Sequence, residues 1–159
     1  MESALNRGNR TVLLLPEEIL AQIIQQAKTE LPNECCGLLA GKIDANRLQG
    51  QVLQAIPLIN ERDSPIEYAS EPKSMLKAYH LMRDKNYDLL AIYHSHPTSL
   101  PIPSWKDRVN ATDSDVVHLI ISLTTDPPTI SCWYLYPCSH EAALWYIQPK
   151  SSTDLHFNS

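Results

Sequence analysis

Long apolar runs, paired cysteines and an excess of basic residues are all missing from this 159-residue sequence. The N-terminal segment has one short apolar run, from Val12 to Pro16, which is too short for a secretory leader or a membrane span. The four cysteines include no CxxC pair, and the adjacent Cys35 and Cys36 would form a strained disulfide. We therefore expect a cytoplasmic protein with reduced, mostly buried cysteines and no membrane contact.

Charge and length narrow the function classes further. Thirteen basic against eighteen acidic residues give a net charge of −5, which argues against binding nucleic acid through its phosphates. The length fits one domain, and no internal repeat or low-complexity linker divides it. We expect a folded domain at 11–149, with flexible ends at 1–10 and 150–159.

Helical and strand patterns alternate along the chain. Apolar residues recur at helical spacing between Pro16 and Pro32, which predicts an amphipathic helix. A second helix is expected from an N-cap at Ser70 to an end near Asn86. The runs that predict strands are 36–41, 51–59, 66–69, 89–93, 116–123, 130–136 and 142–147. This alternation indicates a layered α/β or α+β domain.

The predicted strand at 89–93 leads directly into His94 and His96. In an extended chain, residues i and i+2 project to the same side, so both imidazoles converge at the end of one strand. Imidazole nitrogen suits zinc, and a hydrolytic zinc site needs a third protein ligand plus an open position for water. Asp107 is the best candidate, because a helix that opens at Ser104 would turn Asp107 back toward the histidines.

Hydrolysis also needs a proton acceptor and stabilisation of the oxyanion. Glu34 fits the acceptor role, because it lies at a predicted helix-to-strand junction where a side chain can face a cleft. Spacing alone does not select Glu34 over other carboxylates. Ser104 offers a hydroxyl close to Asp107, and such a donor beside the metal would stabilise the oxyanion.

Each of these residues also has a simpler interpretation. Ser104 and Asp107 have the spacing of a capping box, and the histidine pair alone is equally consistent with capping a strand end. Glu34 alone is more often a surface carboxylate. His118, in an apolar strand, is more often a satisfied core histidine than a ligand. Trp105 is equally consistent with a wall of the site and with a packing residue.

Taken together, Glu34, His94-Ser95-His96-Pro97 and Pro103-Ser104-x-x-Asp107 resemble the JAMM signature of the MPN (Mov34/MPN/PAD-1) family of metallopeptidases. Every signature position is matched, and the compact form resembles the prokaryotic single-domain branch. The resemblance implies an α/β, cytidine-deaminase-like MPN fold, with a mixed central β-sheet sandwiched by α-helices. It also implies Zn²⁺ held by His94, His96 and Asp107, with Glu34 as general base and Ser104 as a catalytic hydroxyl.

The same resemblance implies a reaction and a partner. We expect cleavage of a peptide or isopeptide bond after the C-terminal Gly-Gly of a ubiquitin-like or sulfur-carrier protein. One alternative is a sulfur-carrier protease that releases an amino acid such as cysteine. Another is a non-catalytic MPN scaffold, although scaffold members usually lack one or more signature residues. The sequence indicates neither the substrate protein nor the oligomeric state.

Overall fold

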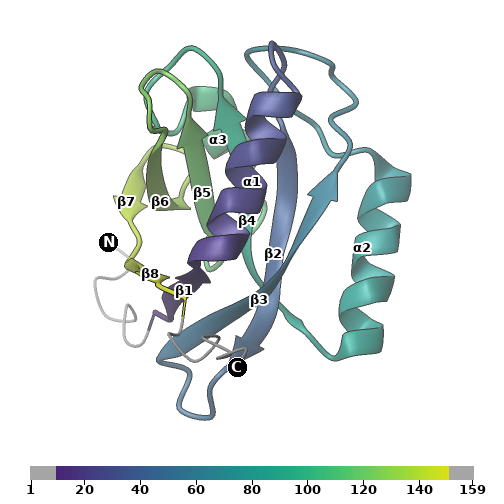
Figure 1. Cartoon of the computed structure of the whole chain (residues 1–159), viewed down its shortest axis with the longest axis vertical. Coiled ribbons are helices and arrows are strands. Elements are labelled where there is room, and N and C mark those ends of the chain that lie inside the picture. Colours follow the sequence, from purple (N-terminus) through teal and green to yellow (C-terminus); the bar gives the residue numbers. More distant parts are fainter. Residues whose placement is uncertain (1–9, 151–159) are drawn as a thin grey trace, which may run out of the picture.

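The computed structural model describes residues 10–150, so the end segments predicted at 1–10 and 150–159 lie almost entirely outside the described residues. The elements, in chain order, are β1 (Val12–Pro16), α1 (Glu17–Thr29), β2 (Cys36–Ile43), β3 (Gln49–Leu58), α2 (Pro72–Lys85), β4 (Asp88–His96), α3 (Trp105–Asn110), β5 (Val117–Ser122), β6 (Thr129–Leu135), β7 (His140–Ala142) and β8 (Trp145–Gln148). Figure 1 shows the helices arranged around a single sheet.

The sheet is mixed, and its strand order is β7-β6-β5-β4-β2-β3-β1-β8. Strand β4 lies in the middle, parallel to β5 and antiparallel to β2. Only Ala143 and Leu144 separate β7 from β8, although these strands stand at opposite ends of the order, so the sheet curls until its two edges approach. The predicted α/β fold with a mixed sheet is confirmed.

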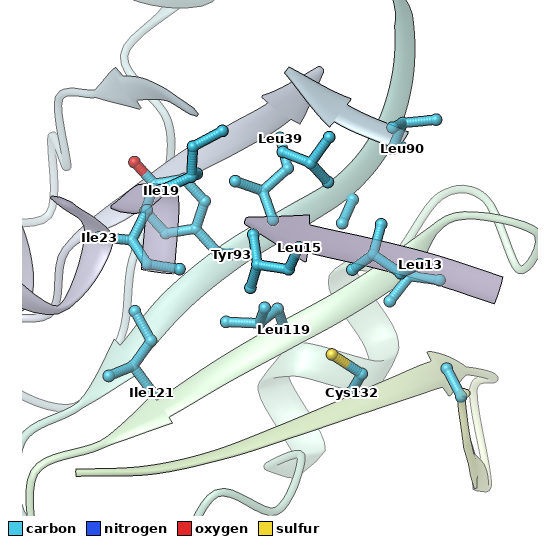
Figure 2. Close-up of a cluster of buried hydrophobic side chains, with 14 of the residues drawn as sticks. Leu13, Leu15, Ile19, Ile23, Leu39, Leu90, Tyr93, Leu119, Ile121 and Cys132 are labelled. Atoms are coloured by element: carbon cyan, nitrogen blue, oxygen red, sulfur yellow. The ribbon is translucent and has the colours of Figure 1, made fainter. Parts of the chain in front are cut away.

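Apolar side chains cover both faces of this sheet. On one face, Ile19 and Ile23 of α1 pack with Leu39, Tyr93 and Leu119, as the close-up shows (Figure 2). Each fully buried side chain of this size contributes about 1.5–3 kcal/mol. The burial of this face therefore anchors α1 on the central strands.

The opposite face is covered by α2. Ala78 and Met82 pack there against Leu38 and Ala40, the neighbours of Leu39 in β2. Successive residues of a strand point to opposite faces, so β2 contributes to both cores. The predicted placement of the sheet between helices is confirmed, and β4 lies at its centre (Figure 1).

Two expected features near the site differ from the sequence prediction. Residues 66–69 form no strand, and only an isolated bridge joins Asn60 to Ser70. The Asn60 side chain bonds to the backbone of Glu67 and Ala69, which replaces a strand ladder with a side-chain clamp. The N-cap of α2 is Glu71, not Ser70, because the Glu71 carboxylate accepts a hydrogen bond from Ser74 N at 3.1 Å.

Two further differences lie at the edges of the sheet. Strand β1 was not predicted, because a short apolar run carries no local sign of its parallel pairing with β3 and β8. The run predicted at 142–147 is divided between β7 and β8. Ala143 N donates to Cys132 O and Leu13 N donates to Leu144 O, so these neighbours bond to different strands.

The cysteine prediction is confirmed. All four cysteines are free, and Cys35, Cys36 and Cys132 are buried, whereas Cys138 is exposed. Among residues 10–150, no helix has the length and hydropathy that crossing a membrane requires.

Candidate metal centre

His94 and His96 end strand β4 with their rings on one side. Their Nε2 atoms lie 3.1 Å apart, and the residues are 0% and 4% exposed. Two ring nitrogens that face each other in a buried place have little to gain from one another. The pair is arranged as two ligands of one ion would be.

Asp107 reaches this pair from the first turn of α3. Its Oδ2 atom lies 3.3 Å from His94 Nε2 and 3.4 Å from His96 Nε2. The helix begins with a full capping box between Ser104 and Asp107, which fixes the carboxylate at the N-terminus. The turn that the sequence predicts for Asp107 is therefore observed.

The three residues fit a divalent metal ion. Two ligand atoms bound at about 2.0–2.1 Å with tetrahedral angles stand about 3.3 Å apart, close to the separations observed here. His96 Nδ1 lies 2.8 Å from Leu100 O, so Nδ1 carries the proton and Nε2 keeps its lone pair for a metal. Two imidazoles and one carboxylate leave room for a water in the fourth position.

The protonation states of His94 and Asp107 also suit a cation. Burial lowers the pKa of His94, which favours the neutral ring that a metal needs. Burial alone would raise the pKa of Asp107, but the two imidazoles in contact with its Oδ2 atom outweigh burial and hold that pKa well below its usual range. The carboxylate is therefore ionised over the whole physiological range.

Glu34 lies two residues before the first residue of β2 and is 5% exposed. Its Oε2 atom has no hydrogen-bond partner within residues 10–150. Burial raises the pKa of this carboxyl to about 8, and the charges of His96, Asp107, Glu67 and Lys106 also act on it. An unsatisfied buried carboxyl near the three candidate ligands is free to exchange a proton with a bound molecule.

Backbone pairing brings Glu34 to this position. Cys36 pairs with His94 across the antiparallel β2 and β4, so Glu34, two residues before Cys36, reaches the end of β4 that carries the histidines. Two hydrogen bonds between Ser95 and Cys35 hold the start of β2 against β4. Ser95 Oγ accepts from Cys35 N at 2.8 Å, and Ser95 N donates to Cys35 O at 3.1 Å. Glu34 N also donates to Ser64 O at 2.8 Å.

Ser104 is the last of the predicted site residues, and it lies at the N-cap of α3. Its Oγ accepts from Asp107 N at 3.1 Å, and its own N–H donates to Asp107 Oδ2 at 2.8 Å. The capping interpretation of this serine is thus confirmed. The hydroxyl hydrogen has no acceptor among the described residues, so it is available to a ligand.

The sequence did not point to Tyr68, and His118 differs from its expected interpretation. Tyr68 stacks on His94, with ring centroids 4.7 Å apart and an interplanar angle of 26°. No spacing rule links Tyr68 to the histidines. His118 is buried, but its Nδ1 has no hydrogen-bond partner in the described chain, so it is not the satisfied core histidine that was expected. Trp105 is 66% exposed and belongs to neither core cluster of residues 10–150.

Sequence similarity to curated relatives extends over most of this chain. A CysO-cysteine peptidase of Mycobacterium tuberculosis is 31% identical over 77% of this chain and 81% of its own. A desampylase of Pyrococcus furiosus is 31% identical over 70% of this chain and 75% of its own. A probable TtuB-protein conjugate cleaving protease of Thermus thermophilus is 36% identical over 60% of this chain and 61% of its own.

Solved structures and a family model also match this chain. A Desulfitobacterium hafniense protein has a TM-score of 0.79 and 27% identity, covering 91% of this chain and 99% of its own. A JAB1/MPN domain protein of Archaeoglobus fulgidus has the same fold, with a TM-score of 0.52 and 20% identity over 85% of this chain and 98% of its own. The model for prokaryotic homologs of the JAB domain matches residues 16–136, and the chain therefore belongs to the prokaryotic JAB family of JAMM/MPN proteins.

Proposed function

We propose that this protein is a zinc peptidase that hydrolyses the bond after the C-terminal Gly-Gly of a ubiquitin-like or sulfur-carrier protein. One observation carries the proposal: Nε2 of His94, Nε2 of His96 and Oδ2 of Asp107 converge within 3.4 Å of one another beside the buried Glu34. The donor set suits zinc, since it combines two imidazole nitrogens with one carboxylate oxygen.

The substrate class follows from the relatives. Their names describe a peptidase acting on CysO-cysteine, a desampylase and a protease for TtuB conjugates. All three names describe removal of something joined to a small carrier or modifier protein. We therefore propose a partner of the same kind, with no nucleic acid and no membrane involved. We also propose a cytoplasmic location, based on the free cysteines.

In the proposed reaction, the zinc ion and the side chains of the protein have separate roles. Zinc held by His94, His96 and Asp107 supplies, when bound, a Lewis acid that lowers the pKa of water toward about 7. Glu34 accepts the proton of the attacking water and returns it to the departing amine. The Ser104 hydroxyl donates a hydrogen bond to the oxyanion that develops on the scissile carbonyl.

The surroundings of Glu34 support its role. A carboxyl with a pKa of about 8, raised by burial, holds a proton at neutral pH far better than an exposed one. The nearby zinc charge would lower this value toward neutrality. A group that must accept and then release a proton works best when its pKa lies near the working pH.

The first experiment measures metal content and cleavage together. Mass spectrometry should find about one zinc per chain in the wild type and none in His96→Ala or Asp107→Ala. Glu34→Gln should keep the zinc and lose cleavage of a Gly-Gly-tailed fusion. A wild-type protein that takes up no zinc when it is added would overturn the proposal and favour the scaffold alternative.

A further inference from the structure

The segment between β4 and α3 connects two of the proposed ligands, His96 and Asp107, and it forms no helix or strand of its own. It contains Pro97, Pro101 and Pro103, and a proline has no backbone N–H to donate. The backbone of this segment therefore has to be held largely through its carbonyl oxygens.

Three consecutive carbonyls of this segment are bonded to three different strands of the sheet. The donors lie in β5, β4 and β6, in that order along the segment, and β6 lies next to β5 (Figure 1). The bonds run from Ser122 Oγ to Ser99 O at 2.7 Å, from His96 Nδ1 to Leu100 O at 2.8 Å and from Trp133 Nε1 to Pro101 O at 2.9 Å. With its carbonyl turned to the sheet, Leu100 is 62% exposed.

The second of these carbonyls orients a proposed metal ligand. Leu100 O accepts the Nδ1 proton of His96, which leaves the lone pair of Nε2 for the ion. Ile102 N also donates to Leu100 O, at 2.8 Å, and this bond closes a three-residue turn centred on Pro101. The carbonyl that orients His96 thus belongs to the turn that Trp133 contacts.

The indole of Trp133 is itself held in place. Its backbone pairs with His118 on one side and with Ala142 on the other. The ring meets the His140 ring edge to face, with centroids 4.9 Å apart and an interplanar angle of 87°. An indole has one donor and no acceptor, and this donor is spent on Pro101 O. The position of the donor is therefore fixed by β6 and β7 together.

Core packing does not account for this tryptophan. Trp133 belongs to neither core cluster of residues 10–150, whereas Trp145 of β8 packs against the cluster on the α1 face. A large ring that lies outside the core and directs its N–H to one carbonyl acts through that bond.

We propose that Trp133 is a positioning residue of the metal centre, because its indole N–H fixes the turn whose carbonyl orients His96. This inference rests on the proposed function, since it concerns the affinity of the site for zinc. Partners that orient a metal ligand typically change metal affinity by about 10–100-fold when they are removed. Trp133 acts one bond further away, so the effect should lie near the lower end, at about tenfold.

The first test removes the indole N–H and keeps the shape of the ring. The full-length chain is made with 3-benzothienylalanine at position 133, in which a sulfur atom replaces the N–H group. Competition with a chromophoric chelator should show zinc bound about tenfold more weakly than in the wild type. Trp133→Phe, which also loses the N–H, should weaken binding at least as much. The matched control Trp145→Phe should keep the wild-type affinity.

A second readout needs neither zinc nor activity. In the metal-free protein, NMR measures how fast the Nδ1 proton of His96 exchanges with water. Without the indole N–H, this exchange should become faster by about two- to tenfold, the effect of one hydrogen bond. The backbone amides of β4 should exchange as in the wild type, because only the turn is released. Trp145→Phe should leave the exchange of the His96 proton unchanged.

The two readouts separate the positioning role from the proposed function. A wild type that binds no zinc would overturn the proposed function, whatever the exchange rates are. If the wild type binds zinc and the benzothienyl protein binds it equally tightly, Trp133 is not a positioning residue. Faster exchange of the β4 amides together with the His96 proton would show a general loosening of the fold, and this result would also overturn the inference.

Discussion

Ser104 and Asp107 hold each other at the start of α3 through two hydrogen bonds, and the Oδ2 atom of Asp107 that accepts from Ser104 N also faces both histidines. One carboxylate therefore serves as part of a helix cap and as a proposed metal ligand. Since α3 buries none of its residues, this cap is its main local anchor. Helix capping and the proposed metal binding are thus coupled at one atom.

Removal of the Ser104 hydroxyl should separate its two roles. Ser104→Ala should cost about 1 kcal/mol of stability, whereas Ser104→Gly should cost only a few tenths, because glycine is tolerated at an N-cap. Both variants lack the donor, so kcat should fall by roughly 10²–10³ in each. Chemical unfolding and steady-state kinetics provide the two readouts. If kcat falls in Ser104→Ala but not in Ser104→Gly, as the free energy of unfolding does, Ser104 has a capping role alone.

Removal of the metal should destabilise the fold. An ion present at about 100 times its dissociation constant stabilises the folded state by about 2.7 kcal/mol. A chelator should therefore lower the melting temperature of the wild type by roughly 5–10 °C. Asp107→Asn keeps an oxygen for the cap but weakens the ligand, so its melting temperature should respond little to chelator. Identical wild-type curves with and without chelator would contradict the metal centre.

The buried carboxyl of Glu34 predicts a pH dependence of the metal-free protein. Burial raises its pKa from 4.5 to about 8, so the folded state binds this proton more tightly than the unfolded state. The resulting stability is complete below pH 4.5 and is lost as the pH rises through about 8, on the order of a few kcal/mol. Glu34→Gln should remove this loss. Urea unfolding at several pH values in chelator measures it, and parallel curves for the two proteins would refute it.

Close packing beneath the site predicts a sensitive glycine. A Cβ at Gly37 would lie 2.2 Å from Cζ of Tyr93, whose hydroxyl donates to Gln26 Oε1 at 2.5 Å. Gly37→Ala should therefore cost about 1–3 kcal/mol or more. It should also reduce metal affinity, because Tyr93 directly precedes His94.

Two further variants check the cause of that effect. Gly50→Ala is the control, because its Cβ would stand 3.2 Å from side-chain methyl carbons of Leu90 and Thr11, which can move. Replacing the ring in Gly37→Ala/Tyr93→Leu should make the combined cost smaller than the sum of the single costs. Additive costs in the double variant would show that the ring is not the obstacle.

Much of the site was predictable because it is local. His94 and His96 share a side through strand alternation, and Ser104 caps Asp107 through helix geometry. The alternation of side chains along the strand and the capping of the helix that carries Asp107 both depend on a few neighbouring residues and their backbone angles. The two main helices were predicted for the same reason, although Ser70 was taken as the cap that Glu71 provides.

The sequence by itself determined the chemical groups and their local geometry: a pair of imidazoles on one strand, a capped carboxylate and amphipathic helices. Only the tertiary structure decided that Glu34 is buried beside them, since this depends on the register of β2 against β4. The stacking of Tyr68, the unpaired His118 and the strand β1 belong to the same class. They arise where distant segments meet, and such contacts are selected by the burial of whole faces, which no local pattern records.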